Sequence, residues 1–130
     1  MISVDSSAIL AILFRESDAN DFIDTLLDNE TVIAAPTLVE MRTVVTRRKV
    51  LEGFDQLDNI LTETKSTVIA FDAEMAIIAG LAFVKYGKGN HPAKLNFGDC
   101  MAYALAKSLD VPLLYKGNDF AQTDIRSARA

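Results

Sequence analysis

The sequence predicts an α/β protein, a three-layer α/β/α sandwich built around a mostly parallel sheet. Two observations lead to this prediction. Short runs of apolar and β-branched residues alternate along the chain with longer stretches of helical pattern, and this alternation is typical of βαβ units. The 130 residues, 50% of them hydrophobic and 24% charged, suit one folded domain, so we expect a single domain over residues 1–130.

The first half of the chain begins with a β-favouring run at residues 2–4. An almost wholly apolar helix is expected at residues 6–14, and an amphipathic one at residues 18–28, where apolar residues recur at helical spacing. A second apolar run predicts a strand at residues 32–35. The two helices expected after it lie at residues 37–49 and 54–63.

The second half of the chain opens with a strand expected at residues 67–71 and an apolar helix at residues 73–84. The apolar part of that helix is about half as long as a bilayer span needs, so no membrane segment is expected. A glycine-containing loop leads to a helix at residues 98–109. The last strand is expected at residues 112–115, with a candidate edge strand near residues 125–128.

Cysteine content and charge narrow the class of protein. The single cysteine, Cys100, cannot form an internal disulfide, and a small chain that folds without one suits a reducing compartment, so the cytoplasm is the expected location. No basic residue precedes the first apolar run and Asp5 interrupts it, which argues against a signal peptide. The net charge of −5 argues against a non-specific nucleic-acid binder, although local basic clusters could still meet a polyanion.

Four carboxylates fall near the carboxyl ends of the expected strands, where ligands bind in parallel α/β folds: Asp5, Glu40, Asp99 and Asp119. Carboxylates that converge without Lys or Arg between them repel one another, and a hard divalent cation relieves that repulsion. Mg²⁺ fits best and Mn²⁺ is an alternative, because one cysteine and one histidine cannot build a zinc site. Such a cation activates water against a phosphodiester, so the carboxylates predict phosphoryl chemistry.

Each carboxylate also has a purely structural reading. Thr37-x-x-Glu40 matches a capping box, in which the Glu40 side chain would accept a hydrogen bond from the amide at the start of its own helix. Asp99 in a first helical turn is favoured by the helix dipole, and Asp5 and Asp119 could be ordinary caps or turn residues. For any one of these acids, the structural role is the commoner one. Their shared position near the carboxyl ends of the expected strands is what favours a functional site.

Four segments carry a resemblance to a known family: SVDSSAIL, PTLVEM, NFGDCMAYALAK and PLLYKGNDF. In this order and spacing they resemble the PIN-domain ribonucleases, and more narrowly the VapC-type toxins of bacterial toxin–antitoxin pairs. The resemblance covers essentially the whole chain. It implies a PIN-like fold in which the four carboxylates are catalytic and hold one or two magnesium ions. Ser7 would support the site, and Asn118 shares that supporting role beside Asp119.

The resemblance implies a magnesium-dependent endoribonuclease toxin, commonly a homodimer, that cleaves transfer or ribosomal RNA and is silenced by a small antitoxin. Lys85, Lys88 and Lys94 form an acid-free basic stretch around glycines, and we expect them to bind RNA. The helices at residues 6–14 and 18–28 combine apolar surface with an acidic run. They are expected to offer a groove to a basic amphipathic antitoxin segment.

Two other classes stay open. A receiver-like, magnesium-binding phosphoacceptor signalling domain also places acids at strand ends, but it normally has paired acids after its first strand. Here Asp5 is followed by two serines, and Asp72 in mid-chain matches a helix N-cap rather than a phosphoacceptor. A metal-free binding module would show no effect of Mg²⁺ on melting or activity. Lys116 could contact phosphate or lie in a solvated turn.

Overall fold

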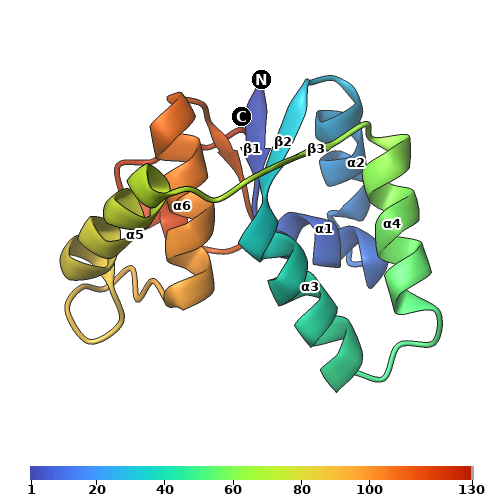
Figure 1. The fold of residues 1–130 in the computed structure, drawn as a ribbon. Helices are drawn as coiled ribbons and strands as arrows, with labels where there is room; N and C mark the ends of the chain where they lie inside the picture. Colours follow the sequence, from blue (N-terminus) through green and yellow to red (C-terminus); the bar gives the residue numbers. More distant parts are fainter. Residues whose placement is uncertain (130) are drawn as a thin grey trace.

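The computed structural model describes residues 1–129 as a parallel sheet between two layers of helices (Figure 1). The sheet has four strands in the order β3-β2-β1-β4, and every pairing between them is parallel. Their bounds are β1 (Ile2–Val4), β2 (Thr31–Ala34), β3 (Thr67–Ile69) and β4 (Leu113–Leu114). The predicted α/β class is therefore confirmed, with β1 and β2 at the centre of the sheet.

Six α-helices flank the sheet: α1 (Ser6–Leu13), α2 (Ala19–Leu27), α3 (Ala35–Arg47), α4 (Gly53–Glu63), α5 (Ala73–Tyr86) and α6 (Phe97–Leu109). In Figure 1, α5 and α6 cover one face, and the other helices pack on the opposite face. Side chains of β2 alternate between the two cores, with Val32 and Ala34 on the α5–α6 side and Ile33 on the other. A strand buried on both faces explains the unbroken apolar run seen in the sequence.

Helix starts set the position of the site. Asp72 is the N-cap of α5, as predicted, and its carboxylate accepts a hydrogen bond from the Met75 amide at 2.9 Å. The predicted capping box at Thr37 is wrong, because α3 begins two residues earlier, at Ala35, with Pro36 in its first turn. Proline suits that turn, since its missing amide hydrogen would have no helical partner there. Glu40 is thereby freed from capping its own helix.

The chain after β4 differs from the prediction. The edge strand expected near residues 125–128 is reduced to one bridge between Leu113 and Ser127, because β4 itself offers only two residues for pairing. A short 3₁₀ helix, η1 (Phe120–Gln122), which the sequence did not predict, buries Phe120 against Tyr115. Among residues 1–129, no helix has the length and apolar character needed to cross a bilayer.

Candidate active site

Asp5 lies at the carboxyl end of central strand β1 and is the N-cap of α1. Its Oδ2 accepts hydrogen bonds from the Ser7 amide at 3.0 Å and the Ser7 hydroxyl at 2.6 Å, whereas its Oδ1 is buried without a hydrogen-bond partner in the described chain. Burial raises the pKa of Asp5 to about 7, with smaller contributions from the charges of Glu40 and Asp99. A buried carboxylate with one free oxygen needs a cation or a proton.

Asp99 lies in the first turn of α6 and takes part in a capping box with Asn96. The Asp99 amide donates to Asn96 Oδ1 at 2.8 Å, and the Asn96 amide donates to Asp99 Oδ2 at 3.0 Å. Desolvation raises the pKa of Asp99 to about 6, and the charges of Glu40 and Asp119 add to that effect. Capping and cation binding by Asp99 are therefore compatible, because the cap uses only Oδ2 and the neighbouring charges are acidic.

Glu40, on α3, lies against the starts of α1 and α6 instead of capping its own helix. Its Oε1 accepts a hydrogen bond from the Ser6 hydroxyl at 2.5 Å, which ties α3 to the start of α1. Its Oε2 lies so close to Gly98 that a Cβ atom at that position would overlap it. Glycine before Asp99 is therefore what lets the Glu40 carboxylate approach the start of α6.

Asp119 and Asn118 follow β4 in a turn that Gly117 permits with a φ of +99°. Both side chains are exposed, and Asp119 is the N-cap residue of η1. The charge of Asp119 contributes to raising the pKa of Asp99. Asn118 is adjacent, and its backbone carbonyl accepts a hydrogen bond from Gln122 at 3.4 Å.

Ser7 links two parts of the site. Its hydroxyl donates to Asp5 and accepts from the Lys116 backbone amide at 2.9 Å, so it joins the start of α1 to the end of β4. The Lys116 ammonium forms ion pairs with Glu16 and, at 3.1 Å, with Asp18. These two acids are the ion-pair partners of Lys116.

Ser6 and Gly98 are site residues that the sequence analysis missed. Ser6 is buried beside Asp5, and its partner Glu40 lies 34 residues away along the chain. The pair of serines after Asp5 was the sequence signal for Ser6, but of the two the prediction assigned a supporting role to Ser7 alone. Gly98 could have been recognised as a close-approach glycine, since it directly precedes an acid.

The donor set fits a hard divalent cation. Within residues 1–129, no three His, Cys, Asp or Glu side chains form a ready-made cation cage. Mg²⁺ does not need one, because it keeps several waters and is typically held by one or two carboxylates. The unpartnered Oδ1 of Asp5, with Asp99 and Glu40 near enough to raise its pKa, supplies oxygen ligands of that kind.

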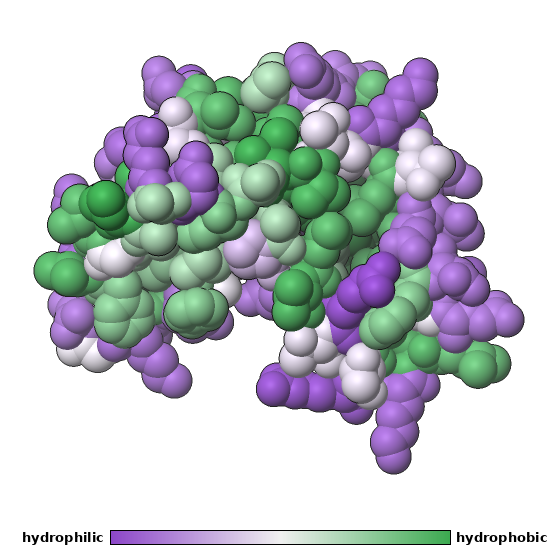
Figure 2. Space-filling view, viewed as in Figure 1, coloured by the Kyte–Doolittle hydropathy of each residue, from purple (hydrophilic) through white to green (hydrophobic). Residues whose placement is uncertain are grey.

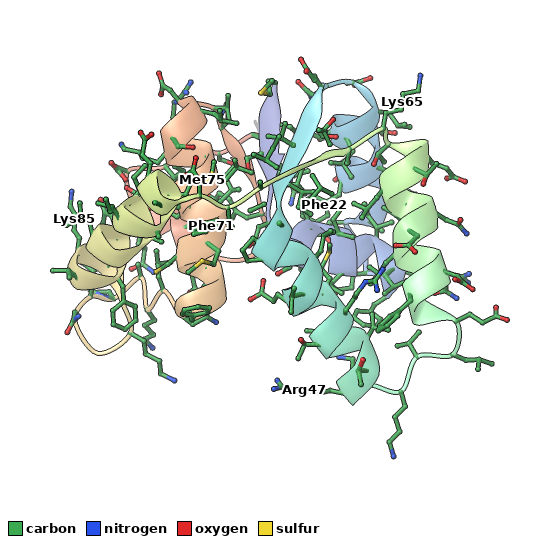
Figure 3. The ribbon with its side chains drawn as sticks, in the orientation of Figure 1. Phe22, Arg47, Lys65, Phe71, Met75 and Lys85 are labelled. Atoms are coloured by element: carbon green, nitrogen blue, oxygen red, sulfur yellow. The ribbon has the colours of Figure 1, made fainter. Side chains whose placement is uncertain are left out.

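The predicted RNA-binding lysines lie away from this rim. Lys85 is on the outer side of α5, on the other side of α6 from α3 (Figure 3). Its ammonium lies 5.0 Å from the centroid of the Tyr86 ring. Lys88 and Lys94 are exposed in the loop that joins α5 to α6. Within residues 1–129, none of these three lysines forms an ion pair with the carboxylates of the candidate site.

A parallel α/β domain with carboxylates at the carboxyl ends of its strands is compatible with the class of metal-dependent phosphodiester hydrolases. Residues 2–126 match the PIN domain family. Ribonuclease VapC42 of Mycobacterium tuberculosis is 41% identical over 127 residues, 96% of this chain and 97% of that protein. Ribonuclease VapC of Mycolicibacterium smegmatis is 39% identical over 123 residues, 94% and 95% of the two chains. The chain therefore belongs to the PIN-domain family, and its enzyme class is ribonuclease.

Solved structures agree on the fold. VapC20 of Mycobacterium tuberculosis, a sarcin-ricin loop cleaving toxin, superposes with a TM-score of 0.78 at 16% identity and covers 96% of each chain. A toxin-antitoxin complex from Klebsiella pneumoniae contains a chain with a TM-score of 0.70 at 14% identity, covering 95% of this chain and 93% of that one. The predicted family is confirmed, and it excludes the receiver-like alternative.

Proposed function

We propose that this ribonuclease is a magnesium-dependent endoribonuclease toxin that hydrolyses RNA phosphodiester bonds and is neutralised by a cognate antitoxin. The observation that carries the proposal is Asp5, a buried carboxylate with an unpartnered oxygen and acidic neighbours. A folded chain tolerates such a group at neutral pH when a cation or a proton neutralises it. Relatives named ribonucleases over nearly the whole chain support the same chemistry.

Each of the four carboxylates would have its own role, which depends on its position. When bound, Mg²⁺ would supply the charge that acidifies water and neutralises the leaving oxygen. Asp5 would hold the cation through Oδ1, and Asp99 through the oxygen that its cap does not use. Glu40, held by Ser6, would carry the charge on the α3 side of the site. Asp119, exposed after β4, would complete the rim, with Asn118 and Ser7 in support.

The test is direct. Purified protein is incubated with total RNA in Mg²⁺ or in chelator, and an Asp99→Asn variant is the control, because asparagine keeps the acceptor that the capping box needs. We expect discrete RNA fragments only for the wild-type protein in Mg²⁺. Identical RNA patterns in all three reactions would reject the ribonuclease toxin. Transfer and ribosomal RNA are the proposed substrates, in keeping with the activity named for VapC20.

An antitoxin partner is proposed by analogy with the Klebsiella pneumoniae complex. The surplus apolar surface expected on α1 and α2 is smaller than predicted, because Phe22 and Leu26 are buried in the core. Leu27 of α2 remains 59% exposed and would lie within an antitoxin groove on this side. Binding of a basic amphipathic peptide that a Leu27→Asp variant loses would support this placement.

A homodimer is proposed from the outer face of α5. Three apolar side chains of this helix are largely exposed: Ile77 (66%), Leu81 (65%) and Val84 (72%). Several exposed apolar side chains on one helix are typical of a surface that a partner covers. Sedimentation of the purified chain measures this, and a monomer at all concentrations would reject it. A cytoplasmic location also stays a proposal, in keeping with Cys100, a free and buried thiol.

A further inference from the structure

Phe97, the first residue of α6, is 78% exposed, whereas Phe54 and Phe83 are 41% and 42% exposed. Exposure of a single apolar side chain is common and does not by itself mark a site. The position of Phe97 is more informative, because its neighbour Gly98 packs directly against the Glu40 carboxylate. The ring is thus anchored one residue, about 3.8 Å of backbone, from a contact of the candidate active site.

Phe97 lines a groove of about 830 Å³ that leads away from the carboxylates. Figure 2 shows this face hollowed between the α5–α6 layer and α3, with apolar side chains around the hollow. Glu40 lies among the groove residues on α3, and Thr43 and Arg47 follow it along the same helix. Asn96 and Phe97 form part of the opposite wall. The groove is therefore continuous with the site and has apolar and hydrogen-bonding walls.

Arg47 gives the groove a basic end. It belongs to the last turn of α3, and Figure 3 shows its side chain projecting beside the hollow. Arg42 pairs with Asp58 at 3.4 Å and Arg48 stacks on Phe14 at 4.4 Å, whereas Arg47 has no ion pair within residues 1–129. An unpaired guanidinium on an acidic protein is suited to a phosphate of the substrate.

We propose that Phe97 is a base-stacking platform: a nucleobase of single-stranded RNA next to the cut site stacks on its ring, while Arg47 contacts the backbone further along the groove. The inference rests on the proposed ribonuclease function. An exposed aromatic ring, a basic end and carboxylates at the other end match the way single-stranded RNA is bound, with bases stacked on aromatic rings and phosphates on arginines. A base in a duplex would be unavailable for this contact, so an unpaired substrate segment is specified.

The experiment separates base from backbone binding. Fluorescence anisotropy in chelator, where metal-dependent cleavage stops, measures the affinity for a short single-stranded oligoadenylate and for an abasic oligomer of equal length. The ratio of the two affinities reports the base contribution. We expect Phe97→Ala and Phe97→Leu to lower that ratio by about tenfold, and Phe97→Trp to preserve it, since stacking contributes on the order of 1–3 kcal/mol per base.

Two further variants are controls. Phe54→Ala removes a partly exposed ring on α4 that does not line the groove, and it should leave the ratio unchanged. Arg47→Gln should weaken both oligomers equally and flatten the salt dependence by a slope of about 0.7, as expected for one phosphate contact on a single strand. An unchanged ratio in Phe97→Ala would overturn the stacking proposal.

The alternative occupant of the groove is a second copy of this chain. If Phe97→Ala and Phe97→Leu shift sedimentation to monomer and leave the ratio unchanged, Phe97 belongs to a contact between copies and the proposal fails. Failure of the ribonuclease function is distinguished separately, by the absence of Mg²⁺-dependent cleavage of total RNA. Cleavage that persists with an unchanged ratio would reject the platform and keep the enzyme.

Discussion

At the scale of single residues, the site is defined by polar contacts between distant segments. Ser6 joins Glu40 across 34 residues, and Ser7 joins Asp5 to the amide of Lys116. Because both serines follow Asp5, the strand-to-helix turn after β1 connects Asp5 to the end of β4 and holds Glu40 of α3. The hydroxyl groups position the acids and leave Oδ1 of Asp5 free.

Glu40→Gln tests whether cleavage depends on the charge of Glu40 or only on its size and hydrogen bonding. Glutamine still offers an oxygen to the Ser6 hydroxyl, and no capping role is lost, because α3 begins at Ala35 without a side-chain cap. We expect a melting temperature within a few degrees of wild type. Turnover should fall by about two orders of magnitude or more, the scale of losing one catalytic group. Wild-type cleavage by a folded Glu40→Gln protein would remove Glu40 from the site.

Asp5 and Asp99 predict how the metal-free protein depends on pH. Their pKa values are raised to about 7 and about 6 from 3.8, so between about pH 4 and pH 7 the folded state binds more protons than the unfolded state. The free energy of unfolding therefore falls as pH rises through this window. In chelator, thermal unfolding should give a higher melting temperature at pH 5 than at pH 8.

Asp5→Asn should remove the larger part of that pH dependence and leave the metal-free protein as stable as wild type or more stable at pH 8. Asparagine serves as an N-cap about as well as aspartate, and it carries no charge. Asp72→Asn, at the exposed cap of α5, is the matched control and should keep the wild-type pH profile. A marked loss of melting temperature for Asp5→Asn in chelator would instead assign Asp5 a structural role.

At the scale of elements, local patterns predicted most of the fold. The four strands and six helices of residues 1–129 were expected close to their observed bounds, because apolar runs and helical patterns depend on residues near one another. Thr37-x-x-Glu40 misled, since a local match cannot show that Pro36 already lies inside the helix. The Ser6–Glu40 contact could not be predicted, because it depends on how α1 and α3 pack across the sheet edge.

The start of α6 combines a cap with Asp99, a proposed metal-binding acid, and a matched pair of variants separates the two roles. Asn96→Ala and Asp72→Ala each remove an N-cap acceptor, from α6 and α5 respectively, and each should cost about 1 kcal/mol of unfolding free energy. Only Asn96→Ala should also weaken Mn²⁺ binding by calorimetry, because the Asn96 side chain accepts from the Asp99 amide and fixes the helical turn that carries the Asp99 carboxylate. Equal Mn²⁺ affinity in the two variants would mean that the cap does not position the site.

At the scale of the whole molecule, charge is segregated in space. The net charge is −5, yet the acids of α2 are on the opposite side of the sheet from α5 and the loop that follows it. Lys116 and Arg129 compensate part of that acidic side through Asp18, which each of them pairs with. An RNA would therefore be repelled on the α2 side and attracted by the basic side chains near α3 and α5.

Replacing Lys85, Lys88 and Lys94 together by Gln tests whether the α5 side guides RNA. If each lysine contacts a phosphate, affinity for single-stranded RNA should fall, and the slope of log affinity against log salt should flatten by about 2, since each contact contributes about 0.7. The base-dependent affinity ratio should stay at its wild-type value, because these exposed lysines do not line the Phe97 groove. Titrations at several salt concentrations measure both quantities. An unchanged affinity and slope would show that the lysines are only solvated, and would leave Arg47 as the proposed basic contact in the groove.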